Sequence, residues 1–272
     1  MSGDSVFVGI NLPRTGSYQL PGGDKLTGYE LAIEHLNAGH KLIRAMAPKV
    51  TTGLLGKKVE QGDAVHRLLL QRGRGGAEQA GGGQKVLHLP GVSGSNETTG
   101  KGCTRYSFRT CFHGRTAAAA LAPVLIKTCG KDKKVAFLTP DYAYGHTVQH
   151  SMLEYLGKGG GKMATNQVSP PGASDFSSCM LNVANSGADA VVNINRGNDA
   201  FSSVKQAAQF GILEKMKMVV AYQIPFLAKE ATPELTQGML VATDFWWTRA
   251  GRYPLAKMFV EEVHQKYGDN PQ

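Results

Sequence analysis

The sequence predicts an α/β fold with doubly wound parallel sheets, and three observations carry this prediction. The chain has 272 residues, which is enough for two α/β lobes. Hydrophobic residues make up 42% and charged residues 19% of the chain, an ordinary composition for a globular protein. Short apolar runs alternate with segments of helical periodicity, which is the pattern of strands followed by crossover helices.

The first strand and helix are expected near the start of the chain. Val6–Leu12 is an apolar run with β-branched residues, which predicts a buried parallel strand. After a Pro-Arg-Thr-Gly turn, apolar residues recur at three- and four-residue spacing over Leu26–Asn37, which predicts an amphipathic helix ending near Gly39. A strand, a turn and a helix in this order open a βαβ unit.

The same alternation recurs in the second half of the chain. Strands are expected at Lys134–Leu138, Met163–Val168, Ala188–Ile194 and Met216–Ala221, and helices at Tyr144–Leu156, Phe176–Asn185 and Asp199–Phe210. Because right-handed crossovers place helices on both faces of a sheet, the predicted architecture is a doubly wound parallel sheet.

The segment Gln61–Gln84 interrupts this pattern. Six glycines fall within the fourteen residues Gln71–Gln84, where an α/β lobe would place a strand, a long helix and another strand. We therefore expect irregular packing in this segment. The alternative is that Arg72 and Arg74 belong to an RGG-type nucleic-acid-binding run, for which one short repeat is weak evidence.

Charge and hydropathy exclude further classes of protein. The formal net charge is +9, but the basic residues are spread widely, so we interpret them as a solvated surface and expect no nucleic-acid partner. No apolar run approaches the roughly 20 residues needed to span a bilayer. Met1–Ser5 is short and polar and shows no signal-peptide pattern, which leaves a cytoplasmic protein and a mature exported form both open.

The sequence lacks the common catalytic motifs. Gly53–Lys58 and Gly157–Lys162 do not have P-loop spacing, and Pro13–Gly16 is not a dinucleotide fingerprint. Ser95 stands at the last position of Gly91–Ser95, where a nucleophile elbow needs a central serine. The eight histidines have no ligand spacing, and no carboxylate pair suits acid–base chemistry. We expect no enzyme, no cofactor and no metal site.

Polar and aromatic side chains follow three of the expected strands. Ser95 and Asn96 follow a strand at Val86–Leu89, Tyr144 follows Lys134–Leu138, and Asn195-Arg196 follows Ala188–Ile194. Ligands of open α/β sheets bind at the carboxyl ends of strands, and helix N-termini there offer free N–H groups. Simple helix caps and turns would explain the same residues.

Several segments carry a resemblance to a known family. They are VGINLPRTGSY with the helix LTGYELAIEHLN, then GVSGSNETTGKGCTRYSFRTCF, LTPDYAYGHTVQ, SPPGASDFSSCMLNVANSGADAVVNINRGNDA and LTQGMLVATDFWWT. In this order, and over most of the chain, the sequence resembles the type I periplasmic binding proteins of ABC transporters, in the branched-chain amino-acid-binding (Leu/Ile/Val-binding) branch.

The resemblance implies two similar lobes with the ligand between them. Residues 1–118 would form the first lobe, residues 119–242 the second, and residues 243–272 would cross back onto the first. The implied function is that of a periplasmic, monomeric solute-binding protein without catalysis. It would close by a hinge motion around a small polar ligand, an amino acid, an amide, a urea-like molecule or an organic acid, and deliver it to the membrane permease of an ABC importer.

The implied compartment also bears on two cysteines. Cys103 and Cys111 are eight residues apart and flank an expected strand at Tyr106–Thr110. In an oxidising compartment a disulfide between them is expected, and two reduced thiols are the alternative.

The resemblance further implies seven ligand-binding residues. They are Ser95, Asn96, Tyr144, Asn195, Arg196, Tyr222 and Gln223. Ser95 and Asn96 fall where small polar residues hold a ligand carboxylate, and Tyr144 falls on a ligand-facing aromatic position. Asn195 and Arg196 fall in a contact loop of the second lobe.

Tyr222 and Gln223 bear on the class of ligand. Amino-acid binders of this family often place an acidic residue there for the ligand ammonium, but the run AYQIP contains none, and Arg196 adds a positive charge. An unpaired buried ammonium would cost a few kcal/mol. We therefore expect an amide, a urea-like molecule or an organic acid rather than a simple α-amino acid.

The chain departs from the family pattern in two places. Gln61–Gln84 replaces the segment that should contain a strand, a helix and the first-lobe serine loop. The chain also stops at Gln272, whereas family members continue, so we expect a truncated chain whose first lobe is incomplete and the less stable one.

Two other functions stay open at this point. One is a ligand-sensing receptor domain of the same fold, similar to an amide sensor. The other is an α/β hydrolase or a nucleotide-binding enzyme, which the missing motifs disfavour.

Overall fold

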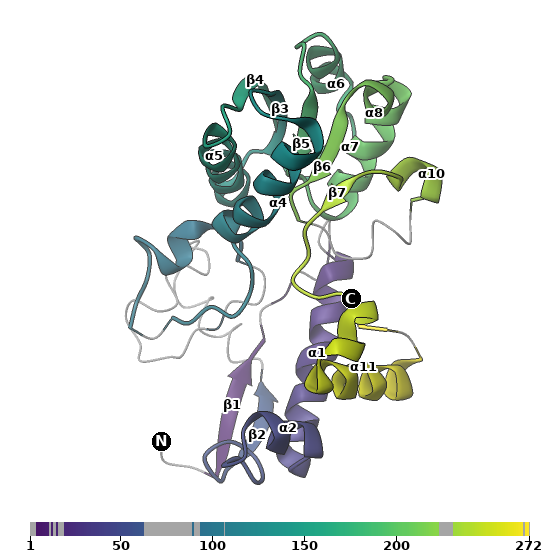
Figure 1. The fold of residues 1–272 in the computed structure, drawn as a ribbon. Helices are drawn as coiled ribbons and strands as arrows, with labels where there is room; N and C mark the ends of the chain where they lie inside the picture. The colour runs from purple at the N-terminus through teal and green to yellow at the C-terminus, as the bar shows by residue number, and fades with distance from the viewer. Residues whose placement is uncertain are drawn as a thin grey trace. The chain divides into compact units, whose positions relative to one another are not determined.

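The structure is a computed structural model that divides into two compact units (Figure 1). It describes residues 4–10, 12, 15, 19–62, 89, 93–105, 107–222, 231–268 and 270–271. Unit 1 comprises residues 1–15, 19–83 and 245–272, and unit 2 comprises residues 16–18 and 84–244. Each unit is described by itself.

Unit 2 is built on a five-stranded parallel sheet. Its strands are β3 (Lys134–Pro140), β4 (Lys162–Ser169), β5 (Ala190–Asn193), β6 (Lys217–Val220) and β7 (Leu240–Val241), in the order β4-β3-β5-β6-β7. Its helices are α4 (Gly114–Cys129), α5 (Ala143–Gly157), α6 (Ser177–Ala184), α7 (Gly197–Gln209), α8 (Ile212–Lys215), α10 (Pro233–Thr236) and the 3-10 helix η2 (Asn96–Thr99). The predicted doubly wound α/β architecture is confirmed in this unit.

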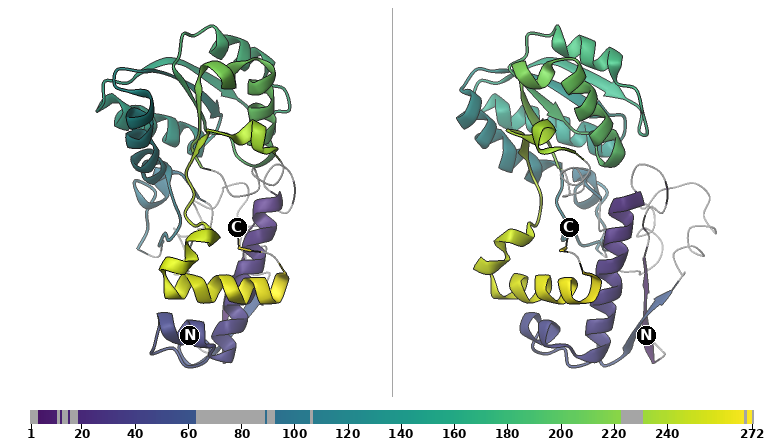
Figure 2. Two further views of the ribbon diagram at one scale, coloured as in Figure 1. Left: turned by 45° about the vertical axis from the view of Figure 1, so that its right-hand side comes forward. Right: turned by 90° about the vertical axis from the view of Figure 1, so that its right-hand side faces the viewer.

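The sheet of unit 2 lies between two layers of helices (Figure 2). Successive side chains of a strand point to opposite faces. Val135 and Phe137 of β3 therefore pack with α4 and α5, whereas Ala136 and Leu138 pack with α6 and α7. All four side chains are almost completely buried. This two-sided burial explains why β3 reads as a continuous apolar run in the sequence.

The described residues of unit 1 form a two-stranded parallel sheet and helices. These are β1 (Ser5–Gly9), β2 (Lys58–Gly62), α1 (Gln19–Ala38), α2 (Lys41–Met46) and α11 (Pro254–Tyr267), with the 3-10 helix η3 (Trp247–Arg252) before α11. The Asn37 side chain ties α1 to β2, because its amide donates to the carbonyl oxygen of Val59 and accepts from the N–H of Val59, both at 2.8 Å. Among the described residues, no helix combines the length and apolar character needed to cross a bilayer.

Several element bounds differ from the sequence expectations. α1 begins at Gln19 rather than near Leu26, and β1 ends at Gly9. Two short strands, β2 and β7, were not expected. No named strand covers Ser107–Thr110, so the predicted strand there is wrong for the part that the structure describes.

Other sequence expectations fall on residues 63–88. Gln61 and Gly62 belong to β2, but the rest of the Gly-rich segment and most of the expected strand Val86–Leu89 lie outside the described residues.

The expected lobe boundary near residue 118 stays a prediction. The compact unit 2 already includes the segment that precedes α4, and hydrogen bonds show how this segment is held. The N–H of Gly114 donates to the carbonyl oxygen of Gly94 at 2.9 Å, and the Asn96 amide donates to the Ser151 hydroxyl on α5 at 3.1 Å. The segment before α4 is thus tied to α4 and α5.

Candidate functional site

The candidate site lies where the strands of unit 2 end. Tyr144 is in the first turn of α5 after β3, and Arg196 is the N-cap of α7 after β5. Tyr222 follows β6, and Asp244 follows β7. The chain moves outward from β3 to β4 and then returns to β5, so the strand order reverses between β3 and β5. Open α/β sheets bind ligands at this kind of switch point.

A buried arginine is the centre of the site. Arg196 is only 7% exposed, and its guanidinium carbon lies 5.0, 5.4 and 4.8 Å from the ring centroids of Phe112, Tyr144 and Tyr222. These distances are within cation–π range. Within the described part of the chain, no carboxylate forms an ion pair with Arg196 at 4.0 Å or less. The site therefore holds a buried positive charge that the rings compensate only in part.

The three rings are fixed by contacts with one another and with a glycine turn. Phe112 and Tyr222 stack with ring centroids 3.5 Å apart and an interplanar angle of 7°, and Phe112 meets Tyr144 edge-on at 6.1 Å. A Cβ at Gly94 would overlap one ring carbon of Tyr144 and lie 2.7 Å from another. A glycine at this position lets the turn approach the rings so closely.

Asp244 holds two of the rings from the edge of the site. Its Oδ2 accepts hydrogen bonds from the Tyr222 hydroxyl at 3.2 Å and from the backbone N–H of Phe112 at 3.3 Å. The Asp244 residue itself is exposed. A carboxylate is therefore present beside Tyr222, although the sequence around Tyr222 and Gln223 contains none.

The environment of Tyr222 raises the pKa of its phenol above the ordinary value near 10. Burial is the main cause, and the neighbouring Asp244 carboxylate adds to it. Above pH 10 the unfolded chain loses this proton while the native state retains it. Stability that Tyr222 contributes below pH 10 is therefore lost as the pH rises through the native pKa.

We expect Tyr222→Phe to make the alkaline loss of stability smaller. The measurement is urea unfolding at pH 9 and pH 11 for the wild type and the variant. Tyr253→Phe is the matched control, because Tyr253 is 61% exposed. An equal loss of stability in the wild type and in Tyr222→Phe would contradict the pKa direction.

The structure places Ser95 and Asn96 in caps that hold α4 and η2. The Ser95 hydroxyl accepts from the N–H of Glu97 at 3.2 Å. The Asn96 Oδ1 accepts from His113 Nδ1 and from the backbone N–H of Arg115, both at 3.1 Å. These bonds use the polar atoms for packing, so a ligand-binding role of the two residues stays a prediction.

Asn195 belongs to a buried amide network. Its backbone N–H and its side-chain Nδ2 both lie 3.1 Å from Asn193 Oδ1, and Asn193 Nδ2 donates to the Ser203 hydroxyl at 2.8 Å. This network fixes the turn that leads from β5 to Arg196. Gln223 lies outside the described residues.

The expected disulfide between Cys103 and Cys111 is not formed in the structure. Cys103 is exposed, and the Cys111 thiol donates to the carbonyl oxygen of Ser93 at 4.0 Å. No named strand covers the described residues between the two cysteines. Their oxidation stays a prediction.

Of the residues expected from the sequence, the structure brings Tyr144, Arg196 and Tyr222 together. It adds Phe112 and Asp244, which sequence reasoning missed. Phe112 lies directly before His113, the N-cap of α4, and Asp244 follows a parallel strand. The position of Phe112 just before a helix start could have been found by the rule that identified the other three, whereas Asp244 follows a strand that the sequence did not predict.

Comparisons with known proteins agree with this architecture. The sequence profile of the family described as periplasmic binding protein matches residues 71–272. Leu/Ile/Val-binding protein homolog 7 of Brucella abortus is 23% identical over 289 residues, which cover 98% of this chain and 72% of that protein.

Solved structures share the fold at low sequence identity. An amino acid ABC transporter substrate-binding protein from Pseudomonas fluorescens Pf-5 has a TM-score of 0.80 at 21% identity, covering 100% of this chain and 74% of that one. An ABC transporter solute-binding protein from R. palustris, solved in complex with benzoate, has a TM-score of 0.73 at 18% identity, covering 98% and 75%. Because the family profile matches well over half of the sequence, the chain belongs to the periplasmic binding protein family.

Proposed function

We propose that this protein captures a small organic carboxylate, and that Arg196 neutralises the charge of the ligand. Membership of the family implies an extracytoplasmic protein that binds small molecules for an ABC transporter. The observation that carries the ligand class is the buried guanidinium of Arg196, which has no ion pair of 4.0 Å or less among the described residues. A buried charge without a partner is costly, so the site favours an anion.

The rings around Arg196 favour a ligand with a flat apolar part. Phe112, Tyr144 and Tyr222 are each less than 8% exposed and bring their ring faces or edges to one guanidinium. A planar guanidinium binds a carboxylate with two parallel hydrogen bonds, and aromatic side chains complement a ring. Benzoate, which the R. palustris protein was solved with, has both features.

An α-amino acid is the second candidate, and Asp244 is the observation that favours it. Its carboxylate lies beside Tyr222, and one oxygen is occupied by two hydrogen bonds. The other oxygen, Oδ1, is available to accept a hydrogen bond from a ligand ammonium. The names of the Brucella abortus and Pseudomonas fluorescens proteins point to the same class. The absence of an acidic residue from the run AYQIP argued against an amino-acid ligand. Asp244 weakens that argument, because it supplies a carboxylate from another part of the chain.

Calorimetric titration of the full chain with four compounds tests the ligand class. Benzoate and benzamide have almost the same shape and differ in charge, so they form a matched pair. We expect benzoate to bind at least about 10-fold more tightly than benzamide, since a charge-assisted pair is lost in the amide. Leucine and acetamide complete the panel. Equal affinities for benzoate and benzamide, or binding of leucine alone, would rule out the proposal.

Asp244→Asn separates the two candidates. If the ligand is an amino acid, this variant loses the acceptor for the ammonium and binds leucine more weakly. If the ligand is an organic acid, the variant binds benzoate at least as well, because a repelling negative charge has been removed.

We also propose that binding occurs without turnover and is accompanied by hinge closure. The family consists of solute-binding proteins, which supports the first point. Incubation with benzamide should release no benzoate, and detectable hydrolysis would instead favour the hydrolase alternative. Hinge closure, delivery to a permease and a monomeric state stay predictions from the resemblance.

A further inference from the structure

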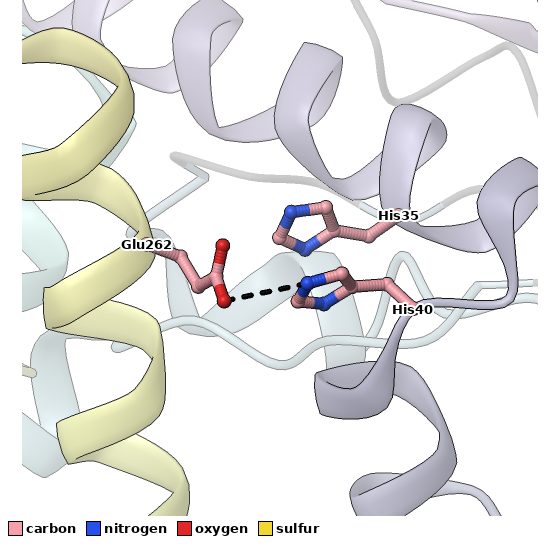
Figure 3. A group of neighbouring side chains, drawn as sticks. All are labelled: His35, His40 and Glu262. Carbon is pink, nitrogen blue, oxygen red and sulfur yellow. Dashed lines mark ion pairs between the residues drawn. The ribbon is translucent and has the colours of Figure 1, made fainter.

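Two histidines and a glutamate converge in unit 1 (Figure 3). His35 is in the last turn of α1, His40 is the N-cap of α2, and Glu262 lies on α11. The ligating atoms that these three side chains offer all lie within 4.8 Å of one another. Nothing in the proposed ligand site of unit 2 involves them.

The three side chains form a compact group with restricted exposure. His35 is buried at 6% exposure, and the side chain of Glu262 is 18% exposed. The two imidazole rings stack with centroids 4.0 Å apart, and His40 Nε2 lies 3.3 Å from Glu262 Oε1.

We propose that His35, His40 and Glu262 bind one divalent transition-metal ion, for which Zn²⁺ has the best-matched chemistry. Two imidazole nitrogens and one carboxylate oxygen are a common ligand set for Zn²⁺, with a water completing the tetrahedron. Metal bonds of about 2.0–2.2 Å require the three ligating atoms to move closer together than they are here. Rotations of the partly exposed His40 and Glu262 side chains supply movements of this size.

The structure also shows what metal binding displaces. His40 Nδ1 accepts from the N–H of Leu42 at 3.3 Å, and coordination through Nε2 would place a proton on Nδ1 and end this long bond. Lys41 Nζ lies 3.2 Å from Glu262 Oε1 and would have to withdraw. The Lys41 side chain is 69% exposed, so water can solvate its ammonium after the withdrawal.

Burial and the neighbouring His40 lower the pKa of His35 below its ordinary value. The assignment is carried by the geometry of the three side chains.

A bound ion would connect parts of unit 1 that are far apart in the sequence. His35 and His40 come from the first 40 residues, and Glu262 comes from the segment that follows unit 2. Crosslinks between distant residues restrict the unfolded chain most. Zn²⁺ is therefore expected to stabilise unit 1 and to raise its unfolding temperature.

The test is titration of the chelator-treated full chain with ZnCl₂ at pH 7.5, followed by calorimetry and by thermal unfolding. His40→Asn removes the imidazole but retains a good N-cap residue, and Glu262→Gln retains the size of the side chain. His264→Gln is the matched control, because His264 is exposed on the same helix α11.

We expect one Zn²⁺ per chain, with affinity reduced about 10-fold or more in His40→Asn and Glu262→Gln and unchanged in His264→Gln. We also expect Zn²⁺ to raise the unfolding temperature of the wild type and of His264→Gln only. The proposal fails if the wild type binds no Zn²⁺, or if all three variants bind it equally well. Neither outcome affects the ligand site of unit 2.

Discussion

Arg196→Gln is expected to lower the affinity for benzoate by about 100-fold. Removing one partner of a buried charge pair costs about 2–5 kcal/mol, and each 1.4 kcal/mol changes a dissociation constant tenfold. Arg196 meets this condition because it is 7% exposed and surrounded by Phe112, Tyr144 and Tyr222. Calorimetric titration of the variant with benzoate measures the loss.

Two further variants make this result specific. Arg115→Gln removes a cation whose side chain is 55% exposed and pairs with Glu154, so benzoate affinity should change less than about threefold. Arg196→Lys retains the positive charge but lacks the planar guanidinium with its parallel N–H donors. This variant should bind benzoate more weakly than the wild type. If Arg196→Gln binds benzoate as tightly as Arg115→Gln does, the guanidinium is not the counter-ion.

Gly145→Ala is expected to destabilise unit 2 by about 3 kcal/mol, near the upper end for overpacked sites. Gly145 lies in the first turn of α5, next to Tyr144 of the site. A Cβ there would overlap the carbonyl oxygen of Pro140 at the end of β3 and lie 3.0 Å from its carbonyl carbon. Backbone atoms of a buried strand cannot move aside as a flexible side chain would.

Thermal unfolding measures this effect, which corresponds to a fall of roughly 6–12 °C for a unit of this size. Gly157→Ala is the control on the same helix, because a Cβ there would meet nothing within 4 Å. Alanine is the better helix former, so Gly157→Ala should leave the unfolding temperature unchanged or raise it slightly. Equal temperatures for the two variants would show that α5 shifts to accommodate the methyl group.

The central strands of unit 2 were predictable because a strand that is buried on both sheet faces appears in the sequence as a continuous apolar run. The apolar runs of β3, β5 and β6 predicted strands that differ from the observed ones by at most two residues at either end. β7 has only two residues, which is too short for any periodicity to show. The start of α1 was missed because its first turn includes glycines and a proline, which are poor helix formers.

Whether the preceding strand could be predicted from the sequence also explains which site residues were found. Arg196 and Tyr144 directly follow strands that the sequence reveals, so the rule for strand ends identified them. Asp244 follows β7, and without that strand its position at the same sheet edge could not be inferred. Asn96 and Asn195 were selected because they follow expected strands and match family positions, but sequence alone does not say whether neighbouring groups of the protein already bond to their amides.

The composition of unit 1 from residues on both sides of unit 2 has a consequence for biosynthesis. Unit 2 is almost continuous in sequence, so its sheet can assemble as soon as its last strand has left the ribosome. α1 and β2 are synthesised earlier than α11, which begins 216 residues after the end of α1 and 192 residues after the end of β2. The elements of unit 1 are therefore complete only after those of unit 2 have been synthesised.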